Sequence, residues 1–266
     1  MYLDHFLHIF AALIPAIVIL IYVYKQDKFP EPKKIVFKTF LFGCATVLAI
    51  DLFIPVLDNF SETNFTGDTY YFFDSFIRAA FLEEFFKSVV LIFFCTRKSV
   101  FDEPMDGIVY GVAASLGFAA YENIDYVKYF SQKTSILDIS LLRTFSAVPM
   151  HALCGVIMGF FITLSIFNKK NNYIFLILAI FVPVGMHGLY NFSLSSDLVS
   201  NEIANVILFL SFLAAIYLFR EMKFKQSAGK MFHQKFYTIT LSDFFQATSS
   251  VLVMYLIMNY IIEITF

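Results

Sequence analysis

Seven polar residues in apolar segments have side chains that could activate water or stabilise charge. The stretch FLEEFFKSVV places Glu83, Glu84 and Lys87 within a run of apolar residues. In a membrane, a single carboxylate in such a segment would cost roughly 2.5–3.5 kcal/mol. Residues of this kind therefore indicate a functional site. The other four occur later in the chain: Glu122 in GFAAYEN, His151 in VPMHALCG, and His187 and Asn191 in MHGLYNF.

The spacing of these residues places each of them on a defined helix face. Glu83 and Lys87 are four residues apart with the acid first, which is the favourable order for an ion pair on a helix. The same spacing separates Phe118 from Glu122, His151 from Gly155, and His187 from Asn191. Each segment therefore presents a short polar or small-residue stripe to a neighbouring helix instead of to lipid.

The composition indicates that the seven polar residues are positioned by membrane-spanning helices. Of 266 residues, 59% are hydrophobic and 15% are charged, and 36 are Phe. This is too apolar for a soluble domain of this length and predicts an all-α polytopic membrane protein. Its partner is then the lipid bilayer, and the net charge of −2 gives no indication of nucleic acid. Cys44, Cys95 and Cys154 lie in apolar stretches without CxxC spacing and are expected to be small buried side chains.

Eight apolar segments approach the roughly 20 residues that a helix needs to cross a bilayer. They are residues 6–24, 36–57, 73–95, 106–127, 144–167, 173–192, 204–219 and 243–263. The sequence thus predicts about eight transmembrane helices in a single integral membrane domain, 1–266. The first apolar run lacks a basic leader and a small-residue cleavage site, so we expect a retained span. The only sizeable hydrophilic loop is expected at 220–235.

The basic residues predict the orientation of these spans. Fourteen Lys and Arg residues lie in or beside the odd-numbered connectors, and three lie in the even-numbered ones. Positive charge concentrates on the cytoplasmic side. We therefore expect a multi-pass membrane protein with both termini outside the cytoplasm, and the even number of spans agrees with both termini lying on one side.

The depth of the polar residues predicts that four helices share one site. With a rise of 1.5 Å per residue, Glu83 lies about 15 Å and His151 about 10 Å below the outer surface, while Glu122 and His187 lie about 8 Å below it. Each residue alone has a structural explanation. A membrane histidine can bond a carbonyl, Glu122 can be interfacial, and Glu84 can simply balance Lys87. Together in one layer, they predict a four-helix catalytic core.

Small residues on two of these segments would let the helices approach closely. Gly107 and Gly111 are four residues apart in the fourth segment, and so are Gly155 and Gly159 in the fifth. Such small-xxx-small faces allow close contact between helix backbones in membranes. A compact site formed by four helices requires this closeness.

The polar motifs together resemble those of a known family. EEFFK fits an EExxK motif, FDEPMDGIVYGVAASLGFAAYENIDYV contains an FxxxE motif ending at Glu122, His151 follows, and HGLYN fits HxxxN. This order resembles the PrsW-type intramembrane proteases over residues 70–195, the expected protease core. The family is related to CAAX-processing and bacteriocin-immunity membrane proteases. The resemblance implies a membrane-anchored protein substrate, such as an anti-sigma factor.

If the chain hydrolyses peptide bonds, as the resemblance implies, each of the seven residues can be given a role. It needs a base for water, stabilisation of the oxyanion and a proton for the leaving amine. We predict Glu83 as the base, with Glu84 and Lys87 as its electrostatic frame, although either glutamate could serve. Glu122 would orient the water. His187 and Asn191 would hold the oxyanion, with His151 as a further candidate. The CAAX-type relatives carry His at the position of Glu122 in this chain. The role of that histidine is therefore not assigned to Glu122.

Other functions remain open at this point. Glu83, Glu122, His151 and His187 form a carboxylate and imidazole set that could bind Zn²⁺, although there is no HExxH spacing. We prefer a metal-free glutamate mechanism. Membrane Glu, Lys and His also form proton relays in transporters, but the chain shows no inverted repeat. A non-catalytic scaffold or immunity protein of the same fold is the third alternative.

Overall fold

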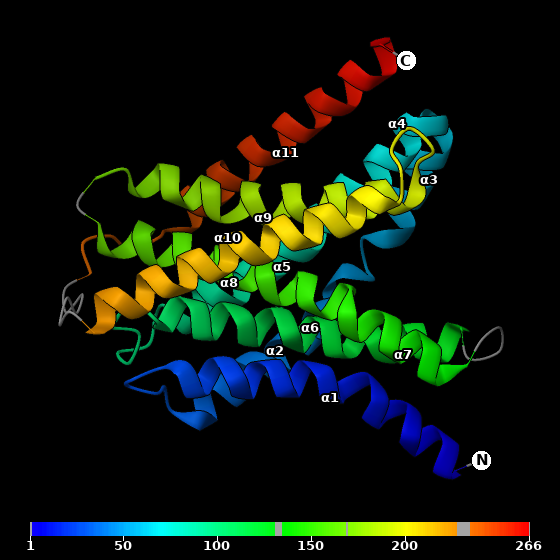
Figure 1. The fold of residues 1–266 in the computed structure, drawn as a ribbon. Helices are drawn as coiled ribbons and strands as arrows, with labels where there is room; N and C mark the ends of the chain where they lie inside the picture. The colour runs from blue at the N-terminus through cyan, green and yellow to red at the C-terminus, as the bar shows by residue number, and fades with distance from the viewer. Residues whose placement is uncertain (1, 131–134, 169, 228–234, 266) are drawn as a thin grey trace.

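The computed structural model describes residues 2–130, 135–168, 170–227 and 235–265, which form helices joined by short connectors (Figure 1). Lys133, Lys169, Lys230 and His233 lie outside these residues. The helical elements are α1 Tyr2–Gln26, α2 Lys33–Ile50, α3 Ile54–Asn64, α4 Gly67–Phe72, η1 Phe73–Phe81, α5 Leu82–Val89, η2 Val90–Cys95, α6 Asp106–Phe130, α7 Ile136–Phe145, α8 Ala147–Phe167, α9 Asn172–Ser195, α10 Glu202–Ser227 and α11 Leu241–Thr265.

Every predicted apolar segment is helical, but fewer helices meet a strict criterion for a membrane span. Four are long and apolar enough: Leu137–Phe167, α9, α10 and α11. A bent pair, α2 and α3, would make a fifth. The segments on α5 and α6 carry glycines or buried charged residues, which lower their hydropathy, and α1 contributes the shorter apolar helix Ala12–Gln26. The expected hydrophilic loop at 220–235 is wrong in its first half, because α10 continues to Ser227.

The break between α2 and α3 lies where the sequence places Asp51 shortly before Pro55. Helix α2 ends at Ile50, α3 begins at Ile54, and the two are bent by 48°. Proline lacks an amide hydrogen and its ring clashes with the preceding turn, so the first turn is its most favourable position in a helix. The bend directs α3 over the end of the bundle where the N-terminus also lies (Figure 1).

The third apolar segment is one continuous helix with two π-helical stretches. They flank α5, the part that carries Glu83, Glu84 and Lys87. A π-helical turn is wider than an α-helical turn and changes which residues face the neighbours, and such turns are common at functional sites. All three charged side chains of α5 are buried against the other helices.

Helices α6 and α8 contact each other backbone to backbone. A Cβ atom added to Gly159 would lie 2.0 Å from the carbonyl oxygen of Gly107, and one added to Gly111 would lie 2.3 Å from that of Gly155. The predicted close approach of these glycine faces is therefore present. Helix α6 also contacts α2 closely, because a Cβ atom on Gly117 would lie 2.0 Å from the Phe40 carbonyl oxygen.

The two ends of the bundle differ. The α1–α2 connector, the connector before α6, the C-terminal ends of α8 and α10 and the N-terminal ends of α9 and α11 lie at one end (left in Figure 1). The N-terminus, α3, α4, α7 and the α9–α10 connector lie at the other end, toward which the C-terminus also extends. This alternation is the one that the predicted topology requires, and it defines the end at which the polar residues of α5, α6, α8 and α9 are found.

Candidate active site

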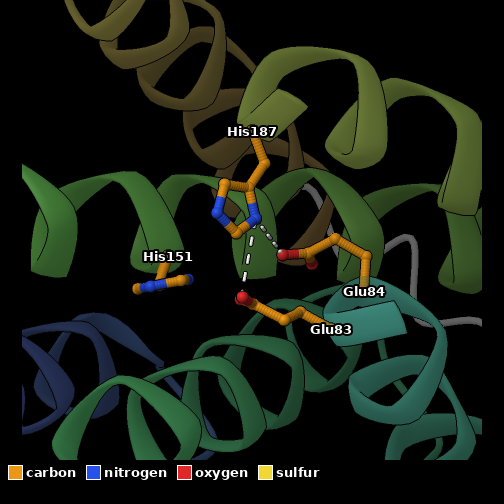
Figure 2. Close-up of side chains that lie close together, drawn as sticks. All are labelled: Glu83, Glu84, His151 and His187. Carbon is orange, nitrogen blue, oxygen red and sulfur yellow. Dashed lines mark hydrogen bonds and ion pairs between the residues drawn. The ribbon is translucent and has the colours of Figure 1, made fainter. Parts of the chain in front are cut away.

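Four of the predicted residues meet between α5, α8 and α9. Glu83 and Glu84 project from α5 toward His187 of α9, and His151 of α8 lies beside them (Figure 2). The rings of His151 and His187 are edge-on, with centroids 5.0 Å apart. All four residues are at most 9% exposed, so their polar atoms depend on one another for hydrogen bonds.

Lys87 is the cation of this group and is fully buried. Its Nζ donates to Glu84 Oε1 at 2.8 Å, to Glu83 Oε2 at 3.3 Å and to His151 Nδ1 at 3.1 Å. An ammonium group has three hydrogens, and here each has an acceptor. The Nζ also lies 4.0 Å from the centre of the Phe118 ring, a favourable cation–π distance. Lys87 thus joins α5 to α8 through a fully satisfied charge.

His151 has both ring nitrogens engaged. Because Lys87 can only donate, Nδ1 of His151 accepts, and the neutral ring therefore carries its hydrogen on Nε2. That nitrogen lies 2.9 Å from Glu122 Oε2 and donates to it. The tautomer is thus assigned from its partners. His151 connects Lys87 to Glu122, and neither nitrogen is free for another ligand.

Glu122 is held by an arginine that the sequence did not single out. Arg143 of α7 donates from Nη2 to Glu122 Oε2 at 2.6 Å and from Nε to Asn123 Oδ1. Its guanidinium lies 3.9 Å from the centre of the Tyr126 ring, and the residue is only 8% exposed. The sequence places Arg143 among the basic residues of an even-numbered connector. The only available signal was an isolated arginine next to an apolar segment.

His187 faces the glutamate pair with one nitrogen only. Its Nδ1 lies 3.1 Å from Glu84 Oε1 and 3.8 Å from Glu83 Oε2. The other ring nitrogen points away from both glutamates (Figure 2). His187 can therefore donate to Glu84 and still offer Nε2 to a molecule beside it.

A cavity of about 630 Å³ makes some of these groups accessible. Its walls include five of the seven predicted residues: Glu83, Glu122, His151, His187 and Asn191. Glu84 and Lys87 are not part of the wall, so Glu83 is the member of the pair that faces the cavity. Among the described residues, the Asn191 side chain makes no hydrogen bond, and its amide is available to a ligand.

The cavity also extends toward one end of the bundle. Three of its lining residues lie at or next to helix ends: Phe130, Ser146 and Ser195. These belong to the end with α7 and the α9–α10 connector, which the sequence predicts to be extracytoplasmic (Figure 1). The shorter path for water therefore runs from that end, as expected from the depth of the polar residues.

The group with spacing suitable for a metal differs from the predicted zinc set. One ligand atom each of Glu83, Glu84, His151 and His187 lie within 4.8 Å of one another, so Glu84 stands where we expected Glu122. Glu122 instead directs Oε2 to Arg143 and His151. Two carboxylates and two imidazoles suit Zn²⁺ in their chemistry. However, Lys87 already bonds three of the four residues, and a divalent ion there would lie against its ammonium. The arrangement therefore does not fit a metal unless Lys87 moves.

Comparison with known proteins decides between the remaining functions. The family model described as "PrsW family intramembrane metalloprotease" matches residues 31–217. The chain belongs to the PrsW family. It is 36% identical to Protease PrsW of Oceanobacillus iheyensis over 78% of this chain and 92% of that protein. It is also 36% identical to the Bacillus subtilis protein over 76% and 88%, and 32% identical to the Clostridioides difficile protein over 73% and 80%.

As a member of this family, the chain is an intramembrane peptidase. It is also a multi-pass membrane protein. The transporter and scaffold alternatives have no comparable support. No solved structure is significantly similar to the chain. The geometry of the site is therefore described from the contacts of this chain alone.

Arg143 provides a test of how the PrsW site is positioned. In Arg143→Leu, Glu122 and Asn123 lose their partner, and we expect the cleavage rate of a membrane-anchored substrate to fall about 10²-fold through misplacement of Glu122. Arg143→Lys keeps the charge but cannot bond both residues, so it should restore only part of the rate. The measurement is kcat and KM with purified protein.

The matched control is Lys128→Leu, which removes an exposed ion pair with Asp125 near the same end of α6. Such surface pairs contribute little, so the rate should stay near that of the wild type. Equal rates for Arg143→Leu and the wild type would show that Glu122 needs no help from α7.

Proposed function

We propose that this chain cleaves a membrane-anchored protein with a water molecule activated by Glu83. The observation that carries the proposal is that Glu83 alone of the glutamate pair faces the cavity while Lys87 and Glu84 stand behind it. A base must reach its water, and its charge must be held in place. Glu83 meets both conditions.

The first step transfers a proton from water to Glu83 as the water oxygen attacks the peptide carbonyl carbon. Lys87 bonds Glu83 Oε2 and fixes the carboxylate. Glu122 keeps Oε2 bonded to Arg143 and His151, and its other oxygen can accept the second hydrogen of the water. When the tetrahedral intermediate breaks down, Glu83 returns its proton to the leaving amine nitrogen.

The developing oxyanion needs donors on another wall of the cavity. The Asn191 amide can supply one hydrogen bond, and His187 can supply another from Nε2 when both its ring nitrogens are protonated. His151 is unsuited to this role, because its only N–H donates to Glu122. We therefore assign His151 to positioning Glu122 and leave the oxyanion to His187 and Asn191.

The substrate follows from the position of the cavity. We propose eight spans with both termini outside the cytoplasm, which places the cavity opening on the extracytoplasmic side of the bacterial inner membrane. The cut should then lie near the extracytoplasmic end of a single-span substrate, where its helix can unwind. A membrane-anchored anti-sigma factor, implied by the sequence resemblance, is the first substrate to test.

Replacing the base tests the mechanism. Glu83→Gln keeps the size of the side chain but cannot take up a proton, so we expect cleavage to fall by at least about 10²–10⁴-fold. Yield and thermal stability in detergent should remain near those of the wild type. Glu62→Gln, an exposed change on α3, is the matched control and should cleave normally. Full activity of purified Glu83→Gln would remove Glu83 from the reaction.

Metal dependence is tested separately, because the family description names a metalloprotease. The ammonium of Lys87 among the candidate ligands supports a metal-free reaction. We expect cleavage to continue at an unchanged rate after dialysis against a chelator, with less than stoichiometric zinc in the protein by elemental analysis. Loss of activity in chelator, together with recovery on addition of zinc, would instead assign the four donors to a metal and require Lys87 to leave them.

Topology and cut site can be tested together. In a variant without Cys44, Cys95 and Cys154, Ser200→Cys should react with a membrane-impermeant reagent added to intact cells, and Ser227→Cys should react only after lysis. Mass spectrometry of the two fragments of a single-span substrate should place the new ends in its extracytoplasmic third. The reverse labelling pattern would overturn the orientation, and a cut in the cytoplasmic third would overturn the assignment of the opening.

A further inference from the structure

A second cluster of buried polar residues lies at the opposite end of the bundle. Asp27 lies in the α1–α2 connector, Glu103 in the connector before α6, and Asp106 at the first position of α6. We call these three residues the acidic cluster. One carboxylate oxygen of each lies within 4.8 Å of those of the other two. The residues are 7%, 1% and 0% exposed, so three carboxylates share a site almost without water.

Each carboxylate of the acidic cluster has one oxygen held by the protein. Asp106 Oδ2 accepts from the backbone N–H groups of Asp102 and Glu103 at 2.6 and 2.7 Å. The Gln226 amide of α10 donates to Glu103 Oε1 at 2.6 Å and to Asp27 Oδ1 at 2.7 Å. These bonds fix the orientation of all three side chains before any ligand binds.

Within the described residues, no N–H or hydroxyl group donates to the second oxygen of each carboxylate. These atoms are Asp27 Oδ2, Glu103 Oε2 and Asp106 Oδ1, and all three are buried. A buried acceptor without a partner costs about 1–3 kcal/mol, and more when it is charged. Three such atoms, each on a side chain more than nine-tenths buried, point to a ligand that they could share.

The acidic cluster also has no ion-pair partner among the described residues, although Lys235 lies close enough to act on Asp106 at longer range. Within the described part of the chain, no Lys or Arg forms an ion pair with these residues, and Glu31 adds a fourth buried carboxylate whose Oε2 accepts from Tyr110. The arrangement therefore disfavours negative charge unless a cation is supplied.

We propose that Asp27, Glu103 and Asp106 bind a hard divalent cation. All the available donors are carboxylate oxygens, which suit Mg²⁺, Ca²⁺ and Mn²⁺ rather than metals that prefer nitrogen or sulfur. Oxygen atoms around such ions lie about 2.0–2.6 Å from the metal, so separations of up to 4.8 Å between ligands are compatible with one ion. The ion would replace the missing hydrogen bonds and neutralise the charge.

This ion would act on the fold and not on the peptide bond. Asp106 and Glu122 are sixteen residues apart on α6, which corresponds to about 24 Å. The ion would instead join the α1–α2 connector to the start of α6, and Gln226 would link α10 to both. The expected consequence is a bundle end that is stable with the ion and weaker without it.

Thermal unfolding of the full chain in detergent tests this site. After removal of metal with a chelator, Mg²⁺, Ca²⁺ or Mn²⁺ is added in separate samples. At saturation we expect at least one of them to raise the midpoint by about 5–10 °C. Asp106→Asn keeps an acceptor for the backbone N–H groups but loses the ligand charge, so the rise should disappear. Asp102→Asn, an exposed neighbour in the same connector, should keep it.

A binding measurement separates this site from the active site. Elemental analysis should find about one Mn²⁺ per chain in the wild type and in His187→Gln, and none in Asp106→Asn. If Asp106→Asn does not fold, Glu103→Gln replaces it, because its amide oxygen can still accept from Gln226. No shift with any of the three ions, or the same shift in the wild type and the ligand variants, would overturn the proposal.

Discussion

The buried ammonium of Lys87 is the interaction on which the arrangement of the site depends. A charge away from water is tolerated only when all its partners are present. Two of its acceptors, Glu83 and Glu84, come from its own helix, and the third, His151, comes from α8. The local pair follows from helix geometry. The third bond fixes how α5 and α8 face each other.

Close helix packing makes these contacts possible. The glycine faces of α6 and α8 remove the side chains that would separate the two backbones, which brings Glu122 of α6 within hydrogen-bond distance of His151 of α8. The π-helical stretches on either side of α5 set the direction of its charged face. Polar groups in a membrane interior must find partners on neighbouring helices, and small residues provide the necessary proximity.

The two ends of α6 bury charge in different ways. Near its C-terminal end, Glu122 has Arg143 and His151 as partners beside an open cavity. At its N-terminal end, Asp106 meets two other carboxylates without a basic partner in the described residues. The first arrangement holds Glu122 in position to orient a water molecule near a substrate. The second suits a bound cation that holds connectors together.

The sequence by itself determined the all-helical membrane class and most of the helical segments, and it singled out the seven candidate residues by their type and spacing. These properties depend on composition and on the fixed rise and period of a helix, which are local. Only the tertiary structure decided that Glu83 and not Glu84 faces the cavity, since adjacent residues point in directions about 100° apart and helix rotation selects between them. It also decided that Arg143 holds Glu122 and that Lys87 stands among the candidate metal ligands. Such contacts depend on how separate helices cross, which no local spacing specifies.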